Sequence, residues 1–391
     1  MFSRRTAWST APSPFAAAAA AARADGRELL DLTVANPTTA GLRHAPALYA
    51  GVGDPGDAAY APLARGLSCA REAVAAYYAR RGDAVDPAQV SILAATSEAY
   101  ADLFALLADP GDAILVPTPS YPLLGYIADL AGVELVPYRL AYDGAWHVDL
   151  GDLPDALARH PRIRAIVAVA PNNPTGNYLD AATIAAFDAL AADRELAVIV
   201  DEVFFDYPLD ARPHLSPLAS PRRALTFVLS GLSKVAALPQ MKLAWAVTAG
   251  PADRVAAALA RLDVITDTFL SASTPIQRAA PALLAAAPAV QETIRARLRS
   301  NLAALRAGCR GTALTPNDVE GGWTALLRLP AVGLDDAAWA LRLLDAGVLT
   351  QPGYLYDLEA PALALSLLTP PETFCRGVER VAALADSILA L

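Results

Sequence analysis

A lysine and a carboxylate that each follow an apolar run are the residues best suited to chemistry in this chain. Residues 230–234 (Ser-Gly-Leu-Ser-Lys) follow one run, and a lysine shielded from water can form a Schiff base with a carbonyl compound. Residues 198–202 end a second run with Asp201, although a carboxylate in this position is often a helix cap or an ion-pair partner. Each segment is a weak signal by itself.

Two further segments combine small, hydroxyl and turn-forming residues. Residues 94–98 (Ala-Ala-Thr-Ser-Glu) open an expected helix, whose first backbone N–H groups are suited to binding a phosphate. Residues 170–176 (Ala-Pro-Asn-Asn-Pro-Thr-Gly) follow an apolar run and, taken alone, predict a tight loop. The order and spacing of the four segments make them more informative together than separately.

With these segments in this order, the sequence resembles the fold-type I, pyridoxal-phosphate-dependent aminotransferases of the aspartate-aminotransferase-like class. The likeness covers nearly the whole chain and includes Tyr60, Arg65 and residues 119–122 (Pro-Ser-Tyr-Pro). It implies a transaminase that moves an amino group between an amino donor and a 2-oxo acid through a Schiff base on Lys234. Two alternatives stay open: a decarboxylase or lyase that uses the same cofactor, and a non-catalytic regulator that binds it.

The resemblance assigns catalytic roles to three residues. Lys234 would hold the cofactor, pyridoxal 5′-phosphate, and would carry a proton once substrate has displaced it. Asp201 would keep the pyridine nitrogen protonated, and Tyr121 would stack on the ring. Further cofactor contacts are implied near the ring's phenolic oxygen for Asn173 and Phe204, and at the phosphate for Ala95, Thr96, Ser97, Ser230, Lys242 and Tyr60. Because Tyr60 reaches the neighbouring subunit's phosphate in this family, a homodimer is expected.

Four positions depart from the family's pattern. Phe204 stands where a tyrosine hydroxyl usually bonds the phenolic oxygen, and Gly231 replaces a phosphate-binding serine. Lys242 replaces an arginine, which exchanges a two-pronged contact for a point charge. The largest departure is Ala364, which takes the place of the arginine that usually holds the substrate's α-carboxylate.

The substrate contacts are therefore sought elsewhere. Thr38 and Asn173 lie in segments that border the substrate in the family, and Arg43 and Arg65 are candidate replacements for the missing arginine. A solvated loop is an equally good interpretation of the segment around Arg43. Trp323, which follows two glycines, is interpreted as a core residue or a pocket wall. The sequence leaves the identities of donor and acceptor open.

These residues need a scaffold that brings the ends of several strands together. Short apolar runs alternate with helix-length segments, which is typical of a mostly parallel sheet with helices on both faces. Ligands bind such sheets beyond the carboxyl ends of the strands. Strands are predicted at residues 114–116, 134–138, 165–169, 197–200, 226–229 and 243–247, and helices at 97–107, 121–130, 181–192 and 291–306, with another that ends near Gly26.

The resemblance also implies the domain organisation. We expect an α/β fold of the fold-type I class, with a mostly parallel seven-stranded sheet flanked by helices in a large domain and a smaller α/β domain beside it. Residues 1–45 are expected to form an N-terminal arm that is part of the small domain. Residues 46–280 would form the large cofactor-binding domain, and residues 281–391 the C-terminal small domain.

Composition narrows the class of protein further. A chain of 391 residues is long enough to bury a large core, and its net charge of −9 would repel nucleic acid. Three cysteines without a CxxC pair and four scattered histidines predict no metal site and a cytoplasmic location. The sequence shows no long, strongly apolar run, which predicts no membrane-spanning segment.

Overall fold

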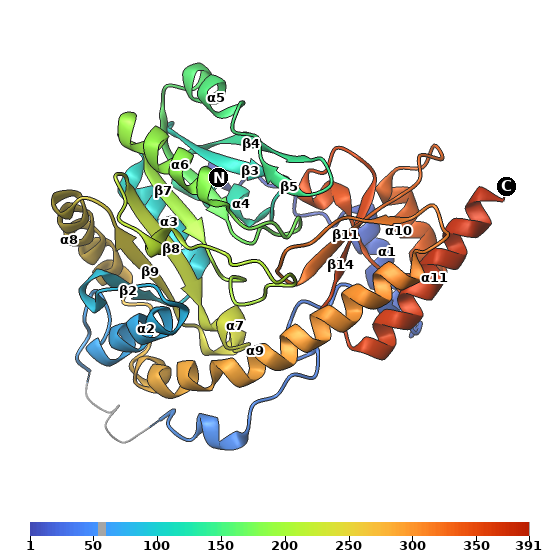
Figure 1. Cartoon of the computed structure of the whole chain (residues 1–391). Helices are drawn as coiled ribbons and strands as arrows, with labels where there is room; N and C mark the ends of the chain where they lie inside the picture. The colour runs from blue at the N-terminus through green and yellow to red at the C-terminus, as the bar shows by residue number, and fades with distance from the viewer. Residues whose placement is uncertain (54–59, 391) are drawn as a thin grey trace.

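The computed structural model describes residues 1–53 and 60–390, and an eight-stranded sheet dominates it (Figure 1). Strands β3, β4, β6, β7 and β8 run parallel, whereas β9 is antiparallel to both of its neighbours. In spatial order the strands are β2 (Val90–Leu93), β9 (Ala244–Ala249), β8 (Leu225–Gly231), β7 (Ala197–Asp201), β6 (Ile163–Val169), β3 (Ala113–Thr118), β4 (Glu134–Tyr142) and β5 (Trp146–Val148).

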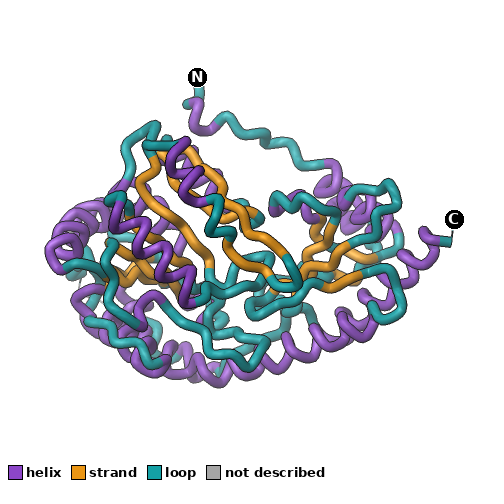
Figure 2. The backbone as a smooth tube through the Cα atoms, turned by 45° about the horizontal axis from the view of Figure 1, so that its top comes forward, coloured by secondary structure: helices purple, strands orange, loops and turns teal. Residues whose placement is uncertain are grey.

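Helices enclose this sheet on both faces (Figure 2), which explains why its central strands are apolar on both sides. Side chains alternate between the faces, so that Ile199 packs in one apolar layer and Val198 in the opposite one. One face is covered by α3 (Thr96–Leu107), α4 (Leu123–Ala131) and α8 (Ala252–Phe269), and the other by α2 (Ser68–Arg81), α5 (Leu153–Arg159), α6 (Ala181–Asp193), α7 (Leu232–Val235) and the first half of α9.

Helix α9 (Thr274–Gly308) is a continuous element of 35 residues that runs from the large sheet to the C-terminal elements (Figure 1). The sequence predicts only its second half, because Pro281 and Pro288 each remove a helical N–H donor. The helix continues through both prolines because its apolar face is buried before them at Ala280, between them at Leu283 and after them at Leu298. The expected boundary at residue 280 thus falls inside one helix, and the division into domains stays a prediction.

The C-terminal elements form a smaller layer with the beginning of the chain. Helix α1 packs on α10, and β1 pairs in parallel with β12. Before α1, the indole of Trp8 donates to Asp129 of α4 over 2.6 Å. The elements are α1 (Pro14–Ala24), β1 (Leu30–Asp31), β12 (Val348–Leu349), the antiparallel strands β10 (Thr315–Pro316), β11 (Thr324–Arg328), β14 (Ala362–Ser366) and β13 (Gln351–Pro352), and helices α10 (Asp336–Asp345) and α11 (Pro371–Leu389).

The predicted fold class is confirmed, with one difference in the large sheet. The eighth strand, β5, has three residues and pairs antiparallel with β4, so it is too short for an apolar pattern to reveal it. Within residues 1–53 and 60–390, no helix combines the length and the apolar character needed to cross a membrane. Short 3₁₀ helices occupy Arg4–Thr6, Pro46–Tyr49, Pro87–Gln89, Pro217–Ala219, Pro239–Met241 and Gly353–Tyr356.

Candidate active site

One edge of the eight-stranded sheet gathers the segments that the sequence singles out. Strands β2, β6, β7 and β8 all point toward this edge, since β2 and β8 are both antiparallel to β9. β2 leads into α3 at Thr96, β7 ends at Asp201, and β8 ends just before Lys234. Ligands bind sheets of this kind at such an edge. The geometry therefore places the four segments where a single ligand can reach them.

Lys234 lies in the short helix α7, which begins directly where β8 ends. Its Nζ is 5.5 Å from the centroid of the Phe204 ring and 5.1 Å from that of Trp323. Burial lowers the pKa of Lys234, and the negative charge of Asp201 opposes this shift. The lowered pKa favours the neutral amine, which is the form that attacks a carbonyl carbon.

Asp201 is 8% exposed and is held by two hydrogen-bond donors. The Val203 N–H donates to Oδ1 over 3.0 Å, and the Tyr100 hydroxyl donates to Oδ2 over 3.2 Å. Burial raises the pKa of Asp201 to about 6, although both donors and the charge of Lys234 act in the opposite direction. A positively charged partner at this carboxylate would lower that pKa again.

The loop after β6 is fixed by hydrogen bonds between its own side chains. The Asn172 amide donates to Thr175 Oγ1 over 2.7 Å and to the Pro119 carbonyl over 3.0 Å. Ser120 donates to Asn172 Oδ1 over 3.1 Å, which ties the loop before Tyr121 to this one. The peptide bonds preceding Pro119, Pro171 and Pro174 are cis.

A glycine turn from the C-terminal part of the chain packs on this loop. The Gly321 N–H donates to the Gly176 carbonyl over 2.9 Å. A Cβ atom on Gly321 would lie 2.6 Å from the Tyr178 ring, and one on Gly176 would lie 2.8 Å from the Gly321 carbonyl oxygen. Because only glycines allow this approach, the turn carries Trp323 to Lys234. Trp323, interpreted from the sequence as a core residue or a pocket wall, is 3% exposed and lies beside Lys234.

The part of the site that is expected to bind the phosphate lies at the starts of helices α3 and α7. Ala95 is the N-cap of α3 and contributes no side-chain cap, so Thr96 and Ser97 present backbone N–H groups without helical partners. Ser230 is fully buried, and its Oγ has no hydrogen-bond partner among the described residues. Lys242 is exposed and adopts a left-handed backbone conformation with φ of 50°.

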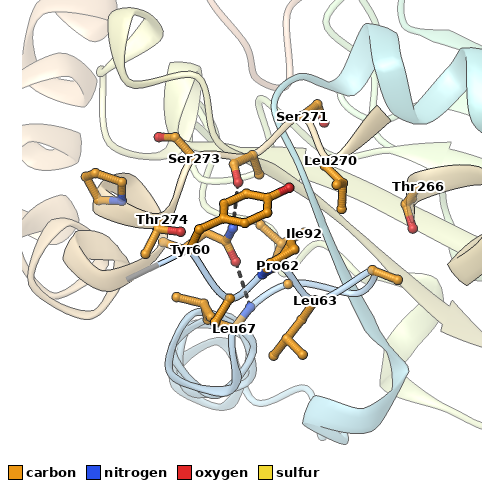
Figure 3. A pocket seen from close by; sticks show the side chains of 16 residues that line it. Tyr60, Pro62, Leu63, Leu67, Ile92, Thr266, Leu270, Ser271, Ser273 and Thr274 are labelled. Carbon is orange, nitrogen blue, oxygen red and sulfur yellow. Dashed lines mark hydrogen bonds between the residues drawn. The ribbon is translucent and has the colours of Figure 1, made fainter. Parts of the chain in front are cut away.

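Tyr60 and Arg65 lie at the β2 side of the sheet, beside α8 and the start of α9. Tyr60 is exposed, and Figure 3 shows it in a pocket that Leu63 and Leu270 also line. Arg65 already has a partner, because its Nε donates to Asp263 over 2.9 Å and its Nη1 to the Ala88 carbonyl over 2.7 Å. Its guanidinium is therefore engaged within this chain, which weakens the case for a substrate contact.

Of the other three substrate candidates, Thr38 and Arg43 are exposed and Asn173 is half-buried. Thr38 uses its hydroxyl to bond Asn36 Oδ1 over 2.8 Å, which closes the local turn. Arg43 makes no hydrogen bond or ion pair within the described part of the chain. No contact of these two side chains with Lys234 or Asp201 is found among the described residues.

Ala364, where the sequence predicts a missing arginine, lies in apolar packing. Ala364 is 1% exposed and clusters with Leu326 and Tyr356. The Tyr356 hydroxyl donates to Gln351 Oε1 over 2.6 Å. Burial raises the pKa of Tyr356, and the charge of Tyr121 adds to this shift. Ala364 thus has a tyrosine–glutamine pair in its neighbourhood, and Tyr121 itself is 50% exposed.

A family model described as "Aminotransferase class I and II" matches residues 27–380. The chain belongs to this aminotransferase family. It is 30% identical over 372 residues to an arginine–pyruvate transaminase of Pseudomonas aeruginosa, which covers 93% of this chain and 92% of the relative. A glutamate–pyruvate aminotransferase of Escherichia coli is 28% identical over 275 residues, or 69% of this chain and 67% of the relative. The prediction of a transaminase is confirmed.

Solved structures of aminotransferases match the fold. An alanine aminotransferase from Pyrococcus furiosus superimposes with a TM-score of 0.90 at 24% identity, over 99% of this chain and all of that one. An aspartate aminotransferase variant from Thermus thermophilus gives a TM-score of 0.85 at 25% identity, over 98% and 99% of the two chains. These matches confirm the fold-type I architecture of the aminotransferase.

The aminotransferase family implies pyridoxal phosphate as cofactor, and the residues at the sheet edge fit this group. Two buried polar atoms, Asn173 Oδ1 and Ser230 Oγ, have no partner within residues 1–53 and 60–390. Lys234 and Lys242 are the chain's only lysines, and both lie at this edge. The unpartnered atoms and the amines suit a ligand that carries an aldehyde, hydrogen-bonding ring substituents and a phosphate.

Three tyrosines of the aminotransferase site escape sequence reasoning. Tyr100 holds Asp201, Tyr207 donates its hydroxyl to the Lys234 carbonyl, and Tyr356 lies near Tyr121. Tyr100 could have been suggested by its helical spacing from Thr96, because both face the sheet edge on α3. Tyr356 lies in a turn after β13 with no periodicity to mark it.

Proposed function

We propose that this aminotransferase binds pyridoxal 5′-phosphate through Lys234, as a homodimer, and uses it to move an amino group from an amino donor to a 2-oxo acid. The observation that carries the proposal is that Asp201 and Lys234 follow neighbouring parallel strands, β7 and β8, at one edge of the sheet. The lysine is a buried amine with a lowered pKa, and the carboxylate is held by the Tyr100 hydroxyl and a backbone N–H. Such a pair supplies both a nucleophile and an anchor for a cationic ring nitrogen.

The cofactor supplies an aldehyde that takes up amines and a ring that withdraws electrons from the bond being broken. The protein's own residues bind the cofactor and move the proton. Lys234 Nζ holds the cofactor and then takes up and returns the proton at the substrate's Cα. The Asp201 carboxylate would keep a proton on the ring nitrogen, and Asn173 would bind the phenolic oxygen. Tyr121 would stack on the ring.

The phosphate would lie at the start of α3 and beside α7. Backbone N–H groups of Thr96 and Ser97 and the buried Ser230 hydroxyl provide neutral donors there, and Lys242 provides a positive charge. Ala95 allows the chain to approach the phosphate closely because its side chain is small. Phe204 contributes its ring at the Lys234 side of the pocket and no hydrogen bond.

Borohydride reduction tests the attachment to Lys234. The reduced, cofactor-loaded protein is digested, and the labelled peptide is identified by mass spectrometry. We expect the cofactor on Lys234 and none on Lys242, which is the only other lysine and hence the matched control. Lys234→Ala should lose the label and Lys242→Ala should keep it. Label on Lys242 alone would show that the proposed attachment is wrong.

A homodimer is supported by an exposed apolar surface at the β2 side of the sheet. Large apolar side chains are exposed there, on the segment after residue 59 and on α8: Tyr60, Leu63, Val264, Phe269 and Leu270. Patches of this kind mark protein–protein contacts. We expect sedimentation to give twice the chain mass of 40.7 kDa, and Phe269→Asp should lower it. In this proposal Tyr60 reaches the partner subunit's phosphate.

The relatives support pyruvate as the first 2-oxo acid to test, because two of them are named for it. Their named donors, arginine and glutamate, differ, so we propose no single donor. Ala364 removes the usual contact for an α-carboxylate, and we propose that Thr38, Asn173 and Arg43 border the substrate instead. The cytoplasmic location expected from the cysteines stays a prediction.

A further inference from the structure

Arg81, the last residue of α2, holds its guanidinium group among buried carboxylates and aromatic rings. Its side chain is 10% exposed, and its Nη2 lies 2.7 Å from Glu202 Oε2 and 3.4 Å from Asp83 Oδ2. The guanidinium also lies 3.7 Å from the centroid of the Phe205 ring, a contact with the ring face that any aromatic residue at this position would keep. Its Nη1 donates to the Tyr77 hydroxyl over 3.1 Å. An arginine suits this place because its planar fork donates in several directions and stacks on aromatic faces.

Tyr77 extends these contacts to a third residue of the segment that follows β7. Its hydroxyl accepts from Arg81 and donates to Asp206 Oδ2 over 2.9 Å. Arg81 thus reaches Asp206 through Tyr77, in addition to its two direct contacts on the same segment. The segment is also closed by its own backbone, because the Phe205 N–H donates to the Glu202 carbonyl over 3.0 Å. Residues 202–206 are therefore held as one unit from the side of α2.

The same segment contacts the active site from its other side. The Val203 N–H donates to Asp201 Oδ1 over 3.0 Å. The Phe204 ring centroid lies 5.5 Å from Lys234 Nζ, and the Tyr207 hydroxyl donates to the Lys234 carbonyl. Residues 203, 204 and 207 therefore contact Asp201 or Lys234, whereas residues 202, 205 and 206 are held from the side of α2.

The contribution of this ion pair to stability does not by itself account for its place in the fold. A buried ion pair contributes little net stability, because removing both charges from water costs about as much free energy as their attraction supplies. Arg81 Nε is buried and has no hydrogen-bond partner among the described residues. Burial raises the pKa of Glu202, although the charge of Arg81 acts in the opposite direction. What the pair fixes well is geometry, and that geometry belongs to the segment beside Lys234.

We propose that Arg81 is a positioning residue of the active site. By holding one side of residues 202–206, it sets how the residues on the other side lie relative to Asp201 and Lys234. The inference rests on the proposed function, which assigns these two residues to the cofactor. Displacement of the segment changes the charges and hydrogen bonds around the bound cofactor. The pH at which the cofactor's visible band changes therefore reports on this role, whereas a purely stabilising contact would leave it unmoved.

Spectroscopic pH titration of the cofactor-loaded variants Tyr77→Phe and Arg81→Lys tests the proposal. Tyr77→Phe keeps the aromatic ring and removes only the hydroxyl that reaches Asp206, and Arg81→Lys keeps the charge and removes the fork. The matched control is Tyr138→Phe. The Tyr138 hydroxyl is also buried and donates over 2.9 Å to the Val167 carbonyl, which lies outside the segment.

We expect the pKa of the visible band to shift by about half a unit or more in both test variants. Transaminase kcat should fall by at least about threefold while KM changes by less than about twofold, because the segment orients the reacting groups and Arg81 is not expected to bind substrate. In Tyr138→Phe the band should keep its pKa, and kcat should change by less than about twofold. Urea unfolding of all three variants records their loss of stability alongside.

A lower urea midpoint with an unmoved band in both test variants would overturn the inference, because Arg81 would then only stabilise the fold. An equal shift in Tyr138→Phe would overturn it too. If Arg81→Lys does not fold, Tyr77→Phe decides alone. Borohydride reduction of the wild type reads the proposed function separately. Label on Lys234 with an unmoved band would keep the function and reject the positioning role, and a shifted band without that label would do the reverse.

Discussion

Lys234 Nζ lies 5.1 Å from the centroid of the Trp323 ring, although Lys234 follows β8 of the large sheet and Trp323 precedes β11 of the four-stranded sheet. The contact depends on the backbone bond between Gly321 and Gly176, which brings the C-terminal turn onto the loop after β6. The aromatic wall excludes water from the amine on one side, while Asp201 faces it with a charge. The effect of burial on the pKa of Lys234 is larger than that of the Asp201 charge, so the pKa is lowered.

Asp201→Asn should stabilise the cofactor-free protein while it removes activity. Burial raises the folded-state pKa of Asp201 to about 6, above its ordinary value of 3.8, so ionisation of the carboxylate costs folding free energy as pH rises through this range. By linkage this cost is about 2–3 kcal/mol above pH 7 and vanishes near pH 4. Urea unfolding at pH 4 and pH 7.5 measures it.

The same variant should lose about a hundredfold in transaminase turnover, because the ring nitrogen loses its ionic partner. An Asp201→Asn protein that is less stable at pH 7.5 and remains active would show that the carboxylate has only a structural role. Tyr100→Phe is the milder comparison, since it removes one donor and keeps the charge.

The sequence identifies the residues at the strand ends but not the partners that decide their roles. Asp201 and Lys234 follow apolar strands, so their position on a parallel sheet is predictable from local pattern. The partner of Arg65 is Asp263, 198 positions away, and no local pattern reveals that this arginine is already paired. Tyr356 covers Ala364 through a turn that has no periodic signal.

Phe204→Tyr should lower the pKa at which the visible band of the bound cofactor changes. The Phe204 ring lies 5.5 Å from Lys234 Nζ, so an added hydroxyl would be close to the phenolic oxygen and would stabilise its negative charge. The proton shared between this oxygen and Lys234 Nζ would then be bound less tightly. We expect the pKa of the visible band to fall by about one unit.

A spectroscopic pH titration of wild type, Phe204→Tyr and Phe205→Tyr measures this difference. Phe205 is the matched control because its ring packs 3.7 Å from the Arg81 guanidinium rather than on Lys234. A pKa that stays equal or rises in Phe204→Tyr would place Phe204 away from the phenolic oxygen.

Glu202→Gln should destabilise the protein strongly, although Glu202 lies next to the site without facing it. Its carboxylate is fully buried and pairs with Arg81 over 2.7 Å. The Arg81 side chain is itself only 10% exposed, so loss of the pair leaves a buried charge and costs about 3 kcal/mol.

Replacing both Arg81 and Glu202 separates the pair's net contribution to stability from the cost of leaving one buried charge unpaired. Because Asp83 also pairs with Arg81 over 3.4 Å, both variants carry Asp83→Asn. In that background the double variant Arg81→Met/Glu202→Leu should be more stable than Glu202→Gln, because none of the three side chains remains charged. Urea unfolding of the two variants decides between these accounts. A double variant that is less stable than the single one would mean that the pair itself is strongly stabilising.

Gly231→Ser would restore the residue that the aminotransferase family usually has before its lysine, yet we expect it to destabilise this protein. A Cβ atom on Gly231 would lie 3.0 Å from the Ala244 Cβ and 3.2 Å from the Ala244 Cα on the neighbouring strand. The backbone of Gly231 is extended, with φ of −176°, so crowding and not conformation opposes a side chain. Overpacking of this kind costs about 1–3 kcal/mol.

The second substitution Ala244→Gly removes the crowding atom and should recover part of that loss. By itself Ala244→Gly should cost about 0.5–1 kcal/mol, since glycine loses more backbone entropy on folding. The two substitutions should therefore be non-additive in urea unfolding, with a coupling energy of about 1 kcal/mol that favours the double variant. Strict additivity would show that β8 and β9 move apart freely at Gly231, and the glycine would then not be required by packing.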